Sequence, residues 1–269
     1  MINPTDAAWS TDPVNRDAFA RLFDMTGRTV IVTGGTKGIG LALAEGFLLA
    51  GAKVVVASRK PEACEQAAEH LRGLGGQAIG VPAHLGSIDD LGSLVQRTVD
   101  EFGGIDVLVN NAANPLAQPI GQVTPEAWDK SYAVNLRGPL FLVQQALPHL
   151  KASPHAAILN MLSTGAFIFT PGMALYAGGK AALMSYTRSM AAEFIPFGIR
   201  VNALAPGPVD TDMMRNNPQE AVDHMKESSL MKRLATPDEM VGAALLLTSD
   251  AGSYITGQVI IADGGGTPR

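Results

Sequence analysis

The spacing of Tyr176, Lys180 and Ser163 could support acid–base chemistry. Tyr176 and Lys180 stand four residues apart in a helix-compatible stretch, and Ser163 lies upstream, after an apolar run. Residues four apart on a helix share one face, with Cβ atoms about 5–6 Å apart. An ammonium about 4 Å from the phenol would favour the phenolate by roughly 4 kcal/mol at an effective dielectric near 20. That is nearly enough to bring a pKa of about 10 close to neutrality, although burial opposes the shift.

A tyrosine tuned in this way could protonate an alkoxide during a reduction or deprotonate an alcohol during an oxidation. Ser163 could hydrogen-bond the substrate oxygen and stabilise the charge that develops on it.

A glycine-rich turn near the start of the chain could hold phosphate. The segment Thr33-Gly34-Gly35-Thr36-Lys37-Gly38-Ile39-Gly40 follows a β-branched apolar run and leads into a helical one. Glycine at positions 34, 38 and 40 lets the backbone approach a pyrophosphate. The N-terminus of the following helix adds oriented N–H groups and the positive end of its dipole. The turn therefore predicts a dinucleotide site.

The end of the second expected strand bears on which dinucleotide binds. The sequence there is Ala57-Ser58-Arg59-Lys60, without the carboxylate that would accept a hydrogen bond from a ribose 2′-hydroxyl. Arg59 can pair with a phosphate in a fork, and Lys37 offers a second cation. We therefore expect NADP(H) in preference to NAD(H). In the alternative interpretation, Arg59 is a solvent-exposed loop residue that binds no phosphate.

The rest of the chain alternates between short apolar runs and longer helical stretches. Strands are expected at Thr29–Thr33, Lys53–Ala57, Ala78–Pro82, Val107–Asn110, Ala157–Met161, Arg200–Leu204 and Val259–Ala262. Most of these runs are continuously apolar, as in strands buried on both faces of a parallel sheet. Helices are expected at Ile39–Leu49, Pro61–Leu74, Ile88–Phe102, Pro125–Leu150, Leu175–Ile195 and Pro237–Thr248.

This alternation predicts an α/β fold: a single doubly wound Rossmann-type domain, with a seven-stranded parallel sheet and helices on both faces. Residues 25–269 would form this dinucleotide-binding domain, and residues 1–24 an N-terminal arm with a short helix near Asp17–Phe23. Residues 207–234 are irregular and rich in methionine. We expect them to form a substrate lid over the carboxyl ends of the strands, where such folds bind ligands. Ser87, Thr124 and Thr236 are expected to cap helices.

Composition excludes several classes of protein. The chain has 269 residues, a formal net charge of −5 and no long basic run, so nucleic acid is not an expected partner. No apolar run reaches the roughly 18 residues that a membrane span needs, and the N-terminus does not read as a signal peptide. A cytoplasmic location is therefore expected. The single cysteine, Cys64, excludes an intrachain disulfide.

With these motifs in place, residues 25–266 resemble a classical short-chain dehydrogenase/reductase. The glycine turn, Ser163 and the Tyr176–Lys180 pair match the motifs of that family. Further matches are Asn110-Asn111-Ala112-Ala113 at the fourth strand, Asn135 in a helix, and Pro206-Gly207-Pro208-Val209-Asp210-Thr211 after the sixth strand. Asp263-Gly264-Gly265 near the end of the chain is another.

The resemblance implies a catalytic or cofactor-binding role for residues of these motifs. It implies that Asn135, Ser163, Tyr176 and Lys180 form the catalytic set, with Asn135 holding a water that links the lysine to solvent. Lys180 would also bind the nicotinamide ribose. The cofactor-binding residues expected from the motifs and the resemblance are Gly34, Thr36, Lys37, Gly38, Ile39, Gly40, Ser58, Arg59, His84, Leu85, Asn111, Tyr176, Lys180, Pro206, Gly207, Val209 and Thr211.

The family also implies transfer of the 4-pro-S hydride without a metal. It further implies a homodimer or homotetramer built through the two long helices expected at 125–150 and 175–195.

Three positions depart from the family pattern. Leu162 stands where many relatives have serine or another small residue, and Ala113 replaces a glycine. His84 stands where many relatives carry an aspartate that binds the adenine amino group. A histidine there could bond to adenine, stack on it, or turn to solvent.

The expected activity is that of a carbonyl reductase or alcohol dehydrogenase acting on a small molecule with an apolar body. Residues 166–169, Met173 and residues 209–231 would form the walls of an adaptable apolar site. The alternatives are an NAD-linked dehydrogenase that works mainly in oxidation and a dinucleotide-binding sensor without turnover. A member of the extended epimerase branch would need a larger C-terminal substrate domain.

Overall fold

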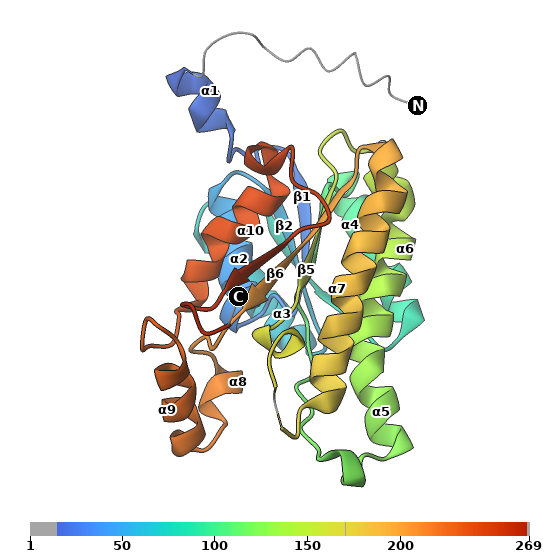
Figure 1. Cartoon of the computed structure of the whole chain (residues 1–269). Helices are drawn as coiled ribbons and strands as arrows, with labels where there is room; N and C mark the ends of the chain where they lie inside the picture. Colours follow the sequence, from blue (N-terminus) through green and yellow to red (C-terminus); the bar gives the residue numbers. More distant parts are fainter. Residues whose placement is uncertain (1–14, 170, 268–269) are drawn as a thin grey trace.

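A seven-stranded parallel sheet forms the centre of the computed structural model, which describes residues 15–169 and 171–267 (Figure 1). The strands are β1 (Thr29–Thr33), β2 (Lys53–Ser58), β3 (Ala78–Pro82), β4 (Val107–Asn110), β5 (Ala157–Met161), β6 (Arg200–Pro206) and β7 (Val259–Ala262). Their order across the sheet is β3-β2-β1-β4-β5-β6-β7. All of these strands occur where the sequence predicts them, and β2 and β6 extend slightly further.

The central strands are buried on both faces, as their continuous apolar runs predict. Every residue of β1, β4 and β5 is buried. The strands pair in parallel, with Ile31 opposite Val55 on one side and Leu108 on the other. Since parallel strands need crossover connections, the intervening helices must cover both faces of the sheet.

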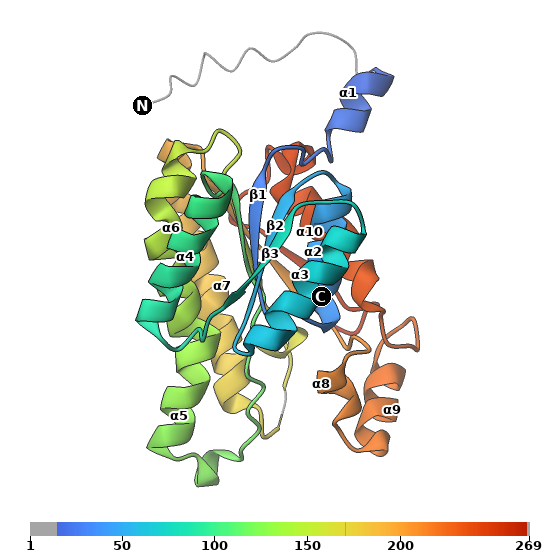
Figure 2. The same cartoon turned by 180° about the vertical axis from the view of Figure 1, so that it is seen from behind.

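Two helical layers provide this cover (Figure 2). One layer contains α2 (Gly38–Leu49), α3 (Pro61–Gly73) and α10 (Val241–Thr248), and the other contains α4 (Ile88–Phe102), α6 (Gly138–Ala152) and α7 (Ala174–Phe194). Phe47 and Leu71 bring the first layer into one hydrophobic core, and Leu94 and Leu142 bring the second into another. The predicted doubly wound α/β class is therefore confirmed.

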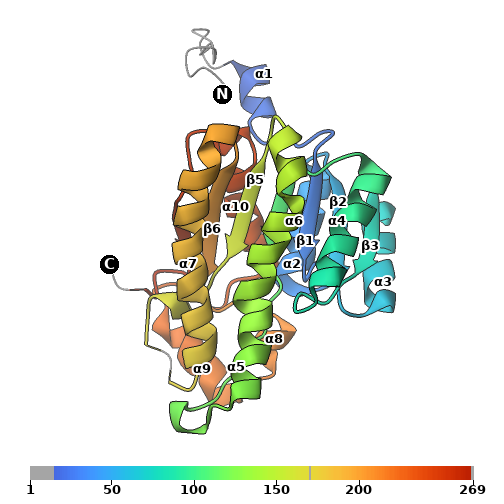
Figure 3. The ribbon, with the colours of Figure 1, turned by 90° about the vertical axis from the view of Figure 1, so that its right-hand side faces the viewer.

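The long helix predicted at 125–150 is divided into segments. It begins as α5 (Pro125–Tyr132), passes through a π-helical turn, η2 (Ala133–Arg137), and continues as α6 beside α7 (Figure 3). In this turn the backbone N–H of Gly138 bonds to the carbonyl of Ala133, five residues back, and Pro139, at the start of α6, has no N–H to donate to residue 135. The hydrophobic pattern alone does not reveal this change of helical pitch.

Several helix ends are closed by the residues that the sequence predicts. Ser87 accepts a hydrogen bond from the backbone N–H of Asp90, and Thr124 accepts one from Ala127. Thr236 forms a capping box with Glu239. The helix predicted at 237–248 begins at this box as a 3₁₀ turn, η5 (Pro237–Met240), before α10.

The remaining short elements lie around the sheet. They are α1 (Arg16–Arg21), α8 (Asp212–Arg215), α9 (Gln219–Ser228), η1 (Ile120–Gln122), η3 (Thr164–Ala166), η4 (Ile195–Phe197) and η6 (Asp250–Gly252). The helix α1 corresponds to the short helix predicted at 17–23, whereas the expected arm before residue 15 lies outside the described residues. The helices α8 and α9 project from the end of the molecule opposite α1 (Figure 1). Within the described part of the chain, no helix is long and apolar enough to cross a membrane.

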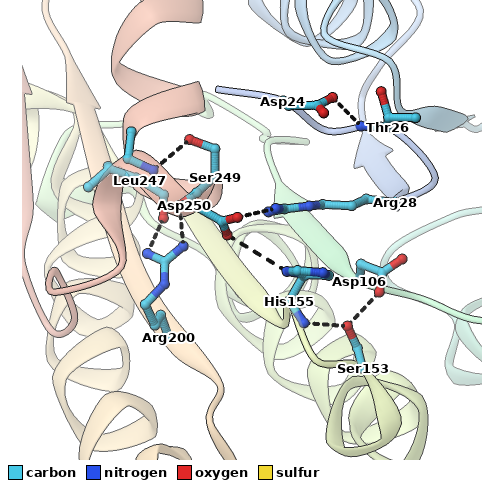
Figure 4. A network of polar contacts seen from close by, with 11 residues as sticks. Asp24, Thr26, Arg28, Asp106, Ser153, His155, Arg200, Leu247, Ser249 and Asp250 are labelled. Carbon is cyan, nitrogen blue, oxygen red and sulfur yellow. Dashed lines mark hydrogen bonds and ion pairs between the residues drawn. The ribbon is translucent and has the colours of Figure 1, made fainter. Parts of the chain in front are cut away.

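A polar network joins the amino ends of the strands (Figure 4). Arg28, just before β1, is 6% exposed and donates to Asp250 over 2.8 Å. Arg200, at the start of β6, donates to the backbone carbonyls of Leu247 and Ser249. This network joins β1, β6 and the segment after α10 at the amino-terminal end of the sheet, which is the end away from α8.

Candidate active site

A groove of about 560 Å³ runs along the carboxyl ends of the strands. The expected cofactor residues that line it are Gly34, Thr36, Lys37, Gly38, Ile39, Gly40, Ser58, Arg59, His84, Leu85, Asn111, Tyr176, Lys180, Pro206 and Thr211. Gly207 and Val209 do not line it. Val209 packs its side chain into the hydrophobic core, at 4% exposed, so only its backbone could approach a ligand.

The glycine turn brings β1 and α2 into close contact. A Cβ placed on Gly40 would lie 2.1 Å from the carbonyl oxygen of Gly34, so only glycine fits there. The helix α2 begins at Gly38, and its N-cap residue, Lys37, makes no side-chain capping hydrogen bond. The first N–H groups of α2 are therefore free of a side-chain cap at the groove, an arrangement that suits a diphosphate.

Asn111 locks the turn to the neighbouring strand. Its amide nitrogen donates to the carbonyl of Thr33 over 2.8 Å, and the hydroxyl of Thr33 accepts the backbone N–H groups of Asn111 and Ala112. Among the described residues other than glycine, only Lys232 has a positive φ. Alanine at position 113, where the family has glycine, therefore causes no backbone strain.

The part of the groove at the ends of β2 and β3 is lined by Ser58, Arg59, His84 and Leu85. The Arg59 side chain is exposed, as a phosphate-binding residue would be before its ligand arrives. The Nδ1 atom of His84 accepts a hydrogen bond from the backbone N–H of Gly86 over 3.0 Å. Since a backbone amide can only donate, the hydrogen of a neutral His84 ring lies on Nε2.

Lys180 is fully enclosed by the protein. It is 2% exposed, its ammonium donates to the carbonyl of Met161 at the end of β5 over 2.6 Å, and it lies 5.7 Å from the centre of the Tyr176 ring. Burial disfavours the charged form and lowers the pKa of Lys180 from 10.5 to about 8. The predicted pairing of tyrosine and lysine along one face of α7 is therefore present.

Burial also controls the phenol. It raises the pKa of Tyr176 above its usual value, and a hydrogen bond with Ser163 offsets part of this rise. Burial is the largest effect on the pKa of Tyr176, and the lowering expected from the Lys180 ammonium does not outweigh it. The Tyr176 phenol therefore keeps its proton at neutral pH.

Ser163 and Asn135 do not line the groove but are held beside it. The hydroxyl of Ser163 accepts the backbone N–H of Gly165, which caps η3. Asn135, in the π-helical turn, is 1% exposed. Its side chain bonds both the N–H and the C=O of Asn114, each over 2.8 Å. The π-helical turn thus joins α5 and α6 to the groove, because Asn114 lines it.

Of the expected apolar walls, Met213 of α8 lines the groove, whereas residues 166–169 and Met173 do not. Phe167 is 37% exposed, Ile168 is 40% exposed and Phe169 is fully exposed. Met231 differs from the expectation. It lines a second hollow, with Leu230 and Ile261, because the chain folds back there against the C-terminal segment.

Two features of the site went unrecognised in the sequence. Asp212 lines the groove and bonds to Lys37, a contact between residues that are far apart in the chain. Asn114 also lines the groove, next to the predicted Asn110–Ala113 motif. In residues 15–169 and 171–267, no group of three or more histidine, cysteine or acidic side chains could hold a metal ion.

Comparisons with known proteins agree with this geometry. Residues 33–267 match a family model described as enoyl-(acyl carrier protein) reductase. A human protein named dehydrogenase/reductase SDR family member 4 is 36% identical over 264 residues, which cover 97% of this chain and 95% of the human protein.

Solved structures share the fold across almost the whole chain. A short-chain type dehydrogenase/reductase from Mycobacterium marinum superposes with a TM-score of 0.87 at 30% identity, covering 92% of this chain and 98% of that one. A Beutenbergia cavernae structure with NADP bound at low occupancy gives 0.85 at 34% identity, covering 91% and 98%. The chain therefore belongs to the classical short-chain dehydrogenase/reductase family of oxidoreductases.

Proposed function

We propose that this protein is an NADP(H)-dependent carbonyl reductase or alcohol dehydrogenase in which Tyr176 is the general acid or base. The observation that supports this most directly is the position of Tyr176 and Lys180. Both residues line the groove beside the glycine turn, where Lys180 is buried and Tyr176 is half-buried. A bound nicotinamide dinucleotide would supply or accept the hydride.

The residues of the chain move and hold the proton. Because burial raises the pKa of Tyr176, the phenol is protonated at neutral pH and suited to donate its proton to an alkoxide during a reduction. Ser163 acts on the same phenol and would hydrogen-bond the substrate oxygen. Lys180 would hold the ribose, and Asn135 would orient the backbone of Asn114 and a water beside the lysine.

The preference for NADP(H) rests on charge at the end of β2. Arg59 lies on the groove there, and no described carboxylate lines that part of it. A guanidinium is suited to bind a 2′-phosphate in a bidentate manner. The Beutenbergia cavernae relative is named as NAD(P)-dependent and holds NADP at low occupancy, which is compatible with the same assignment.

The substrate that we propose is a ketone or secondary alcohol with an apolar body. Met213 lines the groove, and Phe167 and Ile168 are partly exposed apolar residues that follow Ser163 in the chain. Apolar and flexible side chains of this kind accept apolar groups of varied shape. We also propose that the protein assembles as a homo-oligomer through α5, α6 and α7, where Trp128 stands 49% exposed.

The test is Tyr176→Phe. This change removes only the oxygen that donates the proton, so ketone reduction with NADPH should fall by about 10²–10⁴-fold. The affinity for NADPH, measured by calorimetric titration, should stay within about threefold of the original protein because the ring remains. Tyr254→Phe is the control, because Tyr254 is 92% exposed and does not line the groove.

A panel of aliphatic, cyclic and aromatic ketones, with an enoyl thioester as a further substrate, would define the reaction. Near-normal turnover by Tyr176→Phe would exclude Tyr176 as the proton donor. Reduction of the enoyl thioester alone would exclude the carbonyl reaction.

A further inference from the structure

An ion pair connects the glycine turn to the first helix of the lid region. The ammonium of Lys37 lies 2.9 Å from a carboxylate oxygen of Asp212, the first residue of α8, and both residues line the groove. The neighbouring residues are also in contact. A Cβ placed on Gly38 would lie 3.1 Å from a side-chain carbon of Thr211.

The pair is exposed and can exchange partners. The side chains of Lys37 and Asp212 are 73% and 57% exposed. Exposed ion pairs contribute little to stability, and water and salt compete for them. A phosphate brought close to Lys37 could therefore displace the Asp212 carboxylate at small cost.

The charge of the groove makes Asp212 distinctive. Lys37, Arg59, Lys130 and Lys180 contribute cations to the groove. Among the described residues that line it, Asp212 is the only carboxylate. The hydrogen bond and charge of Lys37 hold the pKa of Asp212 below its usual value, so the carboxylate stays ionised at neutral pH. The Asp212 carboxylate is thus paired with Lys37, one of the cations that an anionic ligand would bind.

We infer that Asp212 limits the selectivity of this protein for NADP(H) over NAD(H) by competing with the cofactor for Lys37. This inference rests on the proposed dinucleotide site. A 2′-phosphate adds about 1.5–2 negative charges at neutral pH, so NADP(H) gains more than NAD(H) when Lys37 is freed. Asp212 is a positioning residue in this scheme, because it acts through Lys37.

The experiment is Asp212→Asn, which keeps the size of the side chain and removes its charge. We expect NADPH to bind about two- to fivefold more tightly, the range typical of an exposed ion pair. NADH should bind less than about twofold more tightly. Dissociation constants for both dinucleotides, measured by calorimetric titration at low salt, give the ratio directly.

The chain offers a matched control. Asp223 on α9 is also 57% exposed and also pairs with a lysine, Lys226, over 3.2 Å, but it does not line the groove. Asp223→Asn should leave the ratio of NADPH to NADH affinity unchanged. In a Lys37→Met background, Asp212→Asn should lose its selective effect, which separates competition for Lys37 from a general change in charge.

Three results would overturn the inference while leaving the proposed function in place. They are equal effects of Asp212→Asn on the two dinucleotides, weaker binding of NADPH, and a selective effect that persists in the Lys37→Met background. Weaker binding would mean that the pair closes over the ligand instead of competing with it. Failure of the unaltered protein to bind either dinucleotide would overturn the inference and the proposed function together.

Discussion

Lys180 carries its ammonium into the protein interior, where one backbone carbonyl is its hydrogen-bond partner. Its environment destabilises the folded protein whenever the lysine is charged, since burial lowers its pKa from 10.5 to about 8. A residue kept at such a cost is commonly a functional one, and its position beside Tyr176 is consistent with a role in proton transfer.

This burial predicts an unusual dependence of stability on pH. Below pH 8 the lysine is charged in both the folded and the unfolded chain, so the penalty is fully present. Between about pH 8 and 10.5 the folded protein loses the proton while the unfolded chain keeps it. The free energy of unfolding should therefore rise relative to Lys180→Met, by about 3 kcal/mol in total.

Urea denaturation of both proteins from pH 7 to 10.5 would measure this difference. Lys60→Met, at an exposed lysine before α3, is the control for a general effect of removing a lysine. Unfolding free energies of the original protein and Lys180→Met that run parallel across this range would contradict the assignment of a buried charged lysine.

At the scale of secondary-structure elements, the two ends of the sheet are built differently. The carboxyl ends leave the groove open, whereas the amino ends are closed by the network around Arg28, Asp250 and Arg200 (Figure 4). In this network Arg28 is buried and one of its terminal nitrogens, Nη1, has no hydrogen-bond partner in the described structure. This unsatisfied donor reduces the net contribution of Arg28 to the free energy of unfolding.

The network predicts an asymmetry between its two charged partners. Asp250→Asn leaves the buried charge of Arg28 without its counter-ion and should lower the free energy of unfolding by about 1–2 kcal/mol. Arg28→Met fills the same space without a charge or an unsatisfied donor, and it should change stability by less than about 1 kcal/mol. Urea midpoints at constant m-value would compare the two variants. A larger loss in Arg28→Met than in Asp250→Asn would show that the ion pair is net stabilising.

At the scale of the whole molecule, ligand binding and folding are linked. The groove draws residues from β2, β5, β6, α2, α5, α7 and α8 and from the segments that follow β1, β3 and β4, so it exists only in the folded chain. A ligand that binds only the folded state at about 100 times its dissociation constant stabilises that state by about 2.7 kcal/mol.

The same linkage provides a test of the cofactor assignment. NADPH at that concentration should raise the melting temperature by about 5–10 °C, and NADH at equal concentration should raise it less. Arg59→Asp should reverse this order, because a carboxylate at the end of β2 repels a 2′-phosphate and accepts a ribose hydroxyl. Scanning fluorimetry with both dinucleotides measures this order. If Arg59→Asp reduced the melting-temperature increase equally for NADPH and NADH, the 2′-phosphate would have to bind away from Arg59.

Local patterns in the sequence were sufficient to predict the architecture. The apolar β-branched runs specify strands buried on both faces, and residues such as Thr124 and Ser87 mark helix starts through their own hydrogen bonds. The glycine turn and the Tyr176–Lys180 pair are local as well, because each motif is recognised from residues only a few positions apart in the chain.

Other features depend on contacts between segments that are distant in the chain. The π-helical turn that places Asn135, the return of Met231 to the C-terminal segment, and the pairing of Lys37 with Asp212 all require the sheet to be assembled first. The balance of charge and burial at Tyr176 also belongs to this group. Desolvation depends on how completely the surrounding elements exclude water, and spacing along the chain carries no information on that.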